Sequence, residues 1–217
     1  MHKITKFYIL LVLAVIIAGS AFAWQFFKAR QITVKPITIP LISDGYYEIP
    51  TNEDPILGNP GAPLTLIMFS DFACSDCQKK YSILTDFVKA HPQAARLFLK
   101  FSPQPSLFFK ANDFAYRGAI CADKQNKFWD YNDLLIKTKD PNNQTTLEEN
   151  INDLKINTNT WKDCLVEPLT QQKIAGVTAL SQTLGITKVP TIYINNKRLN
   201  LDTDPNLSDL LSKLVTK

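Results

Sequence analysis

Among the 217 residues of this chain, the four cysteines are the ones most able to do chemistry. Cys74 and Cys77 are separated by two residues and follow the apolar run 64–69, where a buried strand would give way to a helix. A helix N-terminus presents unpaired N–H groups and about half a positive charge, which stabilises a thiolate on the first cysteine. Thiolates are the reacting form in disulfide exchange, and the short spacing allows the two sulfurs to bond. The motif therefore predicts a redox-active pair.

Two other interpretations of Cys74 and Cys77 stay open: half of a zinc site, and an inert structural disulfide. Zinc normally requires a second close pair of ligands, whereas Cys121 and Cys164 lie far apart in the sequence and are each isolated. Redox chemistry is therefore the favoured interpretation.

The composition excludes several other kinds of chemistry. Only two histidines are present, and His2 lies at the terminus, so Ser-His-Asp catalysis or a histidine-rich metal site would depend on His91 alone. The 7 glycines form neither G-x-G-x-x-G nor G-x-x-x-x-G-K, the common phosphate-binding loops. We therefore expect no metal, nucleotide or flavin cofactor.

The net charge of +4 belongs to the N-terminus. Residues 1–30 hold four basic residues and no acidic one, and the remaining 20 basic residues equal the acidic ones in number. Because the rest of the chain is neutral, it lacks the basic excess of a nucleic-acid-binding protein, and we expect no nucleic-acid partner.

Residues 7–27 are uncharged and mostly apolar, and two lysines precede them. About 20 apolar residues are enough for a helix to cross a bilayer, and preceding basic residues are typical of an export signal. Residues 1–30 are then either a signal anchor or a signal peptide cleaved at Ala23. We favour the anchor, because the apolar run continues beyond that site. In both cases the rest of the protein lies outside the cytoplasm, in the periplasm or on the outer face of the plasma membrane.

The remaining sequence alternates strand-like and helix-like patterns. Residues 31–57 are an extended, proline-containing lead-in, in which 37–42 could form an edge strand. Strand patterns occur at 64–69, 95–101, 189–194 and 197–199, and helical periods occur after Cys77, throughout 106–185, and near the C-terminus. The resulting order is β-α-β, a helical block, then β-β-α.

Two local signals refine these elements. Asn195-Asn196 separates two strand patterns and predicts a two-residue hairpin turn. Thr146-Leu147-Glu148-Glu149 predicts a capping box at the start of a helix.

Several of these motifs together resemble the DsbA-like branch of the thioredoxin superfamily. They are Gly58-Asn59-Pro60-Gly61-Ala62-Pro63, Ser70-Asp71-Phe72-x-Cys74-x-x-Cys77, and Val189-Pro190-Thr191, in this order around the helical insert. The resemblance covers residues 58–217. It implies an α/β thioredoxin-like fold with the helical block 106–185 inserted, preceded here by the N-terminal membrane-spanning segment.

The resemblance also implies a role for each residue of the site. Cys74 is the more exposed cysteine that attacks or is attacked, and Cys77 is the more buried one that resolves the mixed disulfide. Val189 and Pro190 shape the substrate groove, with Pro190 in the cis form, and Asp71 assists proton handling at the buried cysteine. Some DsbA-like proteins carry a second, structural disulfide in the helical block, and Cys121 with Cys164 fits that position.

The dipeptide between the cysteines departs from the family pattern. Strongly oxidising members often carry Pro and His there, whereas this chain has Ser75 and Asp76. A cationic His lowers the pKa of a neighbouring thiol, while an Asp raises it by repulsion between like charges. We therefore expect a milder oxidant than the strongest members of the family.

The function implied is an exported enzyme, a thiol–disulfide oxidoreductase that forms disulfides in cysteine-containing polypeptides. A membrane partner that passes electrons to quinone would reoxidise it, and the chain would act as a monomer. A reductase or isomerase of the same fold remains an alternative, although residues 31–57 are too short for the dimerisation domain of isomerases. A membrane-tethered polypeptide-binding or chaperone module without turnover is the alternative from another class.

Overall fold

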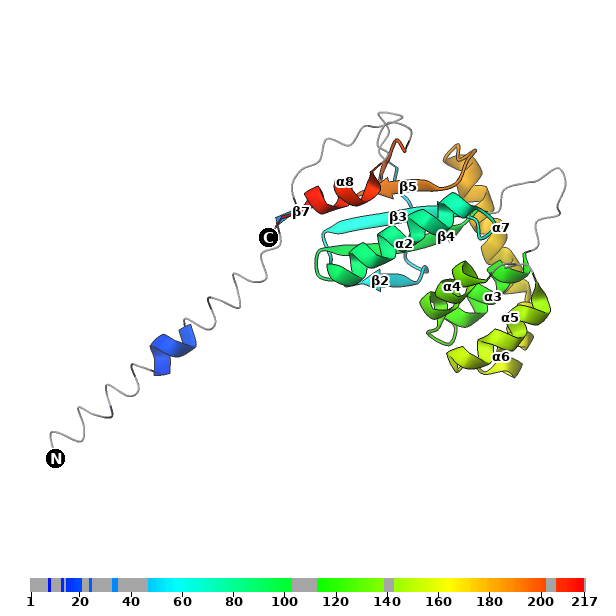
Figure 1. The fold of residues 1–217 in the computed structure, drawn as a ribbon, viewed down its shortest axis with the longest axis horizontal. Coiled ribbons are helices and arrows are strands. Elements are labelled where there is room, and N and C mark those ends of the chain that lie inside the picture. The colour runs from blue at the N-terminus through cyan, green and yellow to red at the C-terminus, as the bar shows by residue number, and fades with distance from the viewer. Residues whose placement is uncertain are drawn as a thin grey trace.

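Two apolar runs form the centre of a five-stranded sheet with the strand order β2-β4-β3-β5-β6 (Figure 1). The computed structural model describes residues 8, 13, 15–20, 24, 33–34, 47–102, 113–138, 143–201 and 206–216. In the sheet, β3 and β4 are parallel and the other pairs are antiparallel. The strands are β2 (Ile56–Gly58), β3 (Leu64–Ser70), β4 (Ala95–Phe101), β5 (Thr191–Ile194) and β6 (Lys197–Arg198).

Both faces of the sheet are covered, which explains why β3 and β4 are apolar almost throughout. Figure 1 shows α2 (Ser75–Ala90) and α8 (Leu207–Leu214) in front of the strands. Leu66 and Met68 pack on this side with the side chains of both helices. The alternate residues of β3, Ile67 and Phe69, pack on the other side near α7 (Pro168–Thr183).

The helices of the predicted helical block that precede α7 lie beside the sheet (Figure 1), and their buried side chains are continuous with its core. Those side chains include Trp161, which is fully buried and donates its Nε1–H to the carbonyl of Gly118 at 2.9 Å. The predicted insert 106–185 corresponds to helices from α3 to the end of α7, while residues 103–112 lie outside the described part. The helices before α7 are α3 (Phe114–Asp123), α4 (Phe128–Lys137), α5 (Gln144–Asn150), the 3-10 helix η1 (Ile151–Leu154) and α6 (Thr158–Leu165).

Part of the predicted lead-in belongs to the sheet. β2 pairs with β4 at the sheet edge, and Ile49 is buried against the face that α7 covers. Gly58 ends β2 with a φ of +93°, and a Cβ there would collide with the carbonyl of Ala95. The chain therefore joins the folded domain before residue 58. The edge strand expected at 37–42 lies outside the described residues.

The two local signals had different outcomes. Asn195 and Asn196 both have positive φ and connect β5 to β6, so the predicted hairpin turn is confirmed. The predicted capping box is wrong: α5 begins three residues earlier, because Asn143 is its N-cap and accepts a hydrogen bond from Thr146 N at 3.1 Å. Asn is a stronger N-cap than Thr, which accounts for the earlier start.

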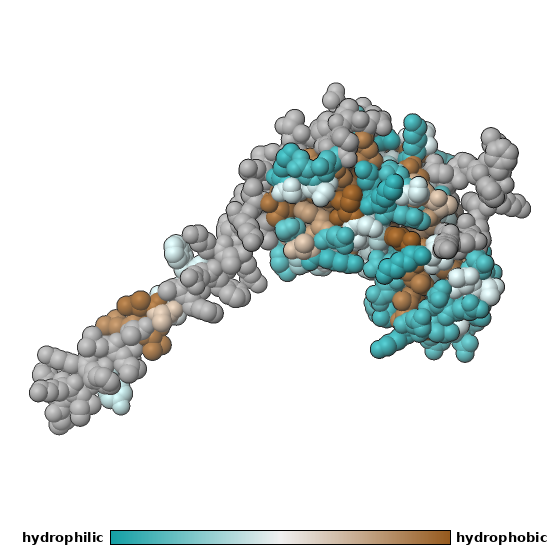
Figure 2. All heavy atoms as spheres, in the orientation of Figure 1, coloured by the Kyte–Doolittle hydropathy of each residue, from teal (hydrophilic) through white to brown (hydrophobic). Residues whose placement is uncertain are grey.

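The N-terminal segment is described only in part. Residues 15–20 are helical, and Figure 2 shows apolar side chains gathered there, in agreement with the exposure of Val15, Ile16 and Ile17. Among the described residues, no helix is both long and apolar enough to span a membrane. Most of the predicted span 7–27, and the cleavage site at Ala23, lie outside them. A short pairing of β1 (Thr33–Val34) with β7 (Val215–Thr216) joins residues near the two ends of the chain.

Candidate active site

Cys74 and Cys77 lie at the start of α2 and are joined by a disulfide, with their Cα atoms 5.2 Å apart. Cys74 is the N-cap residue, and its Sγ accepts a hydrogen bond from the backbone N–H of Cys77 at 3.0 Å. The sulfur thus occupies the place that a capping oxygen takes at other helices. After cleavage of the disulfide, the same N–H and the helix dipole would stabilise a thiolate on Cys74.

The two sulfurs differ in their access to solvent. Cys77 is 1% exposed and belongs to the core beneath α2, whereas Cys74 is half-buried. Ser75 and Asp76 between them are exposed. A substrate sulfur can therefore reach Cys74 and not Cys77, the asymmetry that attack at one cysteine requires.

A hydrogen-bonded turn fixes the entry to α2. Asp71 accepts from the backbone N–H of Ala73 through its carboxylate at 2.8 Å and from that of Cys74 through its carbonyl at 3.2 Å. The hydroxyl of Tyr116 in α3 lies close enough to this carboxylate for its pKa to respond to the charge of Asp71. Burial, and then the charge of Asp71, raise the pKa of Tyr116, so its hydroxyl remains a donor. The helical block thereby lies against the loop that precedes Cys74.

The proline loop lies directly beside the cysteine pair. The Val189–Pro190 peptide bond is cis, and Val189 O lies 3.8 Å from Cys74 Sγ. Both residues of the loop are partly exposed, and β5 begins at the next residue. The structure thus brings together Cys74, Val189 and Pro190, which are separated by more than a hundred residues in the sequence.

Cys121 and Cys164 form a second disulfide, with an S–S distance of 2.01 Å and Cα atoms 5.7 Å apart. Both cysteines are buried, and they connect α3 to α6 inside the helical block. Their place in that core favours a structural role, away from the exposed turn of Cys74.

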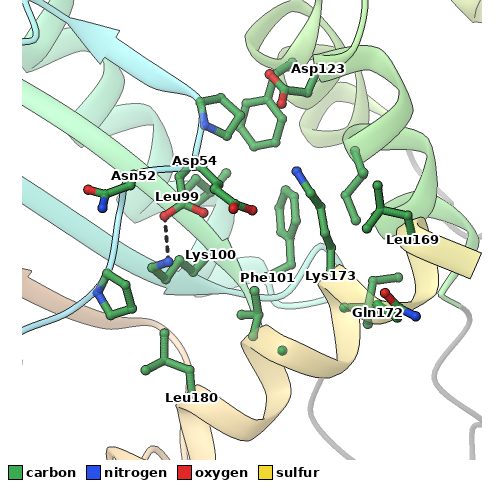
Figure 3. Close-up of a pocket in the computed structure, with 18 residues that line it drawn as sticks. Asn52, Asp54, Leu99, Lys100, Phe101, Asp123, Leu169, Gln172, Lys173 and Leu180 are labelled. Carbon is green, nitrogen blue, oxygen red and sulfur yellow. Dashed lines mark hydrogen bonds and ion pairs between the residues drawn. The ribbon is translucent and has the colours of Figure 1, made fainter.

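A cavity of about 560 Å³ lies away from the cysteine pair, between β4, residues 50–55 and α7 (Figure 3). Neither Cys74 nor Cys77 lines it. At its wall Lys100, which is 5% exposed, forms an ion pair with Asp54 at 2.6 Å. The sequence analysis did not identify this pair, although a lysine between Leu99 and Phe101 in an apolar strand was a usable signal.

Within the described ranges, no group of three or more His, Cys, Asp or Glu residues is arranged to hold a metal ion. With their sulfurs bonded in pairs, the four cysteines provide no thiolate ligand.

Comparison with known proteins gives a consistent result. The sequence model of the family described as Thioredoxin matches residues 50–214. Disulfide bond formation protein D of Bacillus subtilis is 27% identical over 157 residues, which cover 66% of this chain and 68% of that protein.

Solved structures agree with this assignment at the level of the fold. A thioredoxin-like oxidoreductase from Silicibacter pomeroyi is 26% identical, with a TM-score of 0.58, over 67% of this chain and 82% of that one. The α-DsbA1 of Wolbachia pipientis is 17% identical, with a TM-score of 0.62, over 76% of this chain and 92% of that one. Oxidised BdbD of Bacillus subtilis is 20% identical, with a TM-score of 0.61, over 76% of this chain and 94% of that one.

Proposed function

We propose a function for this chain from its family: it belongs to the thioredoxin family, as a DsbA-like member of it. The proposed function is exchange of its Cys74–Cys77 disulfide with cysteines of extracytoplasmic polypeptides. The observation that supports this most is the position of Cys74 Sγ. It caps an N-terminus, is accessible, and lies 3.8 Å from the carbonyl of Val189, while its partner Cys77 is buried.

The proposed reaction has two exchange steps. A substrate thiolate attacks Cys74 Sγ, which breaks the Cys74–Cys77 bond and leaves a mixed disulfide together with a thiolate on Cys77. A second substrate thiolate then attacks the substrate sulfur of the mixed disulfide and displaces Cys74. The substrate is oxidised by two electrons, and the protein is released with both cysteines reduced.

The loop at Val189 and Pro190 would hold the substrate during these steps. Its position beside Cys74 favours an extended substrate segment that pairs with exposed backbone groups, as an added strand would. Main-chain recognition is largely independent of sequence, and it suits an enzyme that acts on many unfolded polypeptides.

Net disulfide formation is the direction we favour. The name of the Bacillus subtilis relative, a disulfide bond formation protein, supports it. A membrane partner that transfers electrons to quinone would reoxidise the reduced pair, and the chain would act as a monomer. The apolar segment 7–27 would keep the enzyme on the outer face of the membrane, with cleavage at Ala23 as the alternative.

Turnover assays on two cysteine variants test this function. With a reduced, unfolded protein as substrate, the wild type should form disulfides and Cys74→Ala should not. When the substrate already carries a disulfide, the Cys74 thiolate of Cys77→Ala should attack it and accumulate the mixed disulfide, because no Cys77 thiolate is present to resolve it; the adduct is visible on a non-reducing gel. If the wild type formed no disulfides, and the wild type and Cys74→Ala kept an unfolded substrate from aggregating equally well, a binding or chaperone module would be the better description.

A further inference from the structure

Cys77 must exchange a proton in every turnover, if the proposed function is correct. When substrate opens the disulfide, Cys77 leaves as a thiolate and must take up a proton; when the disulfide re-forms by the reverse step, it must lose one. Apolar surroundings disfavour a thiolate, and Cys77 is 1% exposed. A route for the proton is therefore required at a sulfur that solvent does not reach directly.

On the face beneath Cys77, β3 is apolar until Ser70, its last residue, which lines a small cavity beside Cys77. The side chains of β3 that pack with Cys77 and α2 include Leu66 and Met68, which are apolar and fully buried. Any polar route has to run through the side of α2 that faces the helical block.

A cavity of about 10 Å³ lies on that side of Cys77. A volume of this size accommodates about one water molecule, provided that polar partners are present. Its polar or titratable lining residues are Ser70, Asp71, Cys77, Gln78, Tyr81 and Asn132.

Asn132 of α4 supplies an unpaired polar atom at this cavity. The residue is 0% exposed, and its Nδ2 donates to the carbonyl of Phe128 at 2.7 Å. Its Oδ1 is buried and has no hydrogen-bond partner among the residues that the structure describes. Leaving such an atom unpaired in the interior is unfavourable, and one bound water would supply the missing hydrogen bond.

Tyr81 and Asp71, two titratable residues at this cavity, differ in their hydrogen bonds and in their exposure to solvent. Tyr81 donates its hydroxyl to Asp133 at 2.8 Å, and burial together with that bond raises the pKa of Tyr81, so its proton is retained. Asp71 is partly exposed, and its carboxylate accepts a hydrogen bond from Ala73 N at 2.8 Å. The side of Asp71 is therefore the direction in which the cavity approaches solvent.

We propose that this cavity binds a single water, held by Asn132 Oδ1, through which Cys77 exchanges its proton with solvent on the side of Asp71. The water donates one proton to the Cys77 thiolate as it accepts another from the solvent side, so that it is regenerated. In the reverse step both transfers run backwards. Asn132 is a positioning residue in this scheme, because it acts on Cys77 through the water.

The test measures the Cys77 thiol directly, in a Cys74→Ser background, by the pH dependence of its ¹³Cβ chemical shift. Asn132→Leu keeps the approximate volume and removes the acceptor. It should raise the Cys77 pKa by about one unit, a tenfold loss of thiolate below the pKa, because the water that stabilises the thiolate is no longer held. Ile136→Leu, which alters the same cavity without a polar atom, should leave the pKa unchanged.

Two results would overturn the proposal: an unchanged Cys77 pKa in Asn132→Leu, or an equal shift in Ile136→Leu. In the Cys77→Ser background, the pKa of Cys74 should not respond to Asn132→Leu. Because the titration needs no substrate, it stands or falls separately from the proposed function, which the Cys74→Ala turnover assay decides.

A measurement on the wild type covers the case in which Asn132→Leu does not fold. In ¹⁵N-labelled protein, the side-chain amide protons of Asn132 should show a nuclear Overhauser contact with a long-lived water. The absence of that contact would contradict the proposal.

Discussion

Cys74 and Cys77 have identical side chains three residues apart, and the helix start gives them different chemistry. Cys74 Sγ accepts the Cys77 N–H at the N-cap, whereas Cys77 lies one turn further and faces the core. Stabilisation of a thiolate by the helix N-terminus therefore acts mainly on the sulfur that substrates can reach. Burial of Cys77 also protects its sulfur from unrelated thiols.

Asp76 offers a way to change the redox potential at this scale. Replacing it with His should stabilise the Cys74 thiolate, because a negative charge is lost and a positive one can be gained. The reduced form then becomes more favourable, and the reduction potential should rise by about 30 mV for a tenfold change in the exchange equilibrium. Equilibration with glutathione measures it. Because Asp76 is exposed, the shift should shrink at high salt.

The matched control is Asp86→His, which makes the same substitution at an exposed position further along α2. It should leave the potential within error of the wild type. A wild-type potential of about −120 mV, the value of the strong oxidant DsbA, would contradict the expectation of a milder oxidant.

At the scale of elements, the second disulfide holds two helices of the insert together. Replacing both Cys121 and Cys164 by Ala opens a loop of 43 residues and should destabilise the protein by about 3–4 kcal/mol on the chain-entropy model. Urea unfolding measures the loss. Disulfide exchange at Cys74 should persist below the lowered unfolding midpoint, because the bridge lies outside the active-site turn. Loss of exchange in a folded double variant would show that the bridge does more than stabilise.

The attachment of residues 47–58 depends on a buried ion pair. Asp54→Ala leaves the ammonium of Lys100, 5% exposed, without its partner and should cost about 3 kcal/mol. Lys100→Met should cost less, because the carboxylate of Asp54 is 20% exposed and can be hydrated. Urea unfolding of both variants tests the order. Lys89→Met, which breaks an exposed pair with Asp133, is the control and should change stability by at most about 1 kcal/mol.

Elements that depend on neighbouring residues could be predicted from the sequence, and those that depend on distant partners could not. The cysteine pair at a helix start and the Asn195-Asn196 turn are local patterns, and both are present. β2 has only three residues, and its pairing with β4 is set by contacts with a strand some forty residues later. The contact of Asp54 with Lys100 is non-local in the same way.

The candidate site shows the same division. The exposure of Cys74 and the burial of Cys77 follow from helix geometry once the start of α2 is known. Asn132, in contrast, is one amide on the apolar side of a helix, and no local pattern relates it to Cys77. Only the packing of α4 beside α2 brings both residues to one cavity.

At the scale of the whole molecule, the active site lies where the sheet and the helical block meet. An aromatic cluster joins the two parts: Phe72 of the active-site loop contacts Phe101 of β4 and Tyr116 of α3, and Phe101 also contacts Phe128 of α4. The helical block therefore supports the turn at Cys74 from one side, and the proline loop flanks it from the other. A substrate bound at the proline loop contacts the sheet side of this junction, while proton exchange at Cys77 is proposed on the helical side.

The direction of electron flow is a property of the molecule together with the membrane partner proposed above, and thiol trapping in living cells measures it. We expect the Cys74–Cys77 pair to be oxidised at steady state, because a disulfide-forming enzyme has to be recharged faster than substrates reduce it. Removal of the proposed quinone-linked partner should shift the pair to the reduced form, while Cys121–Cys164 stays bonded in its buried core. A pair that is reduced in unperturbed cells would instead identify a reductase or an isomerase.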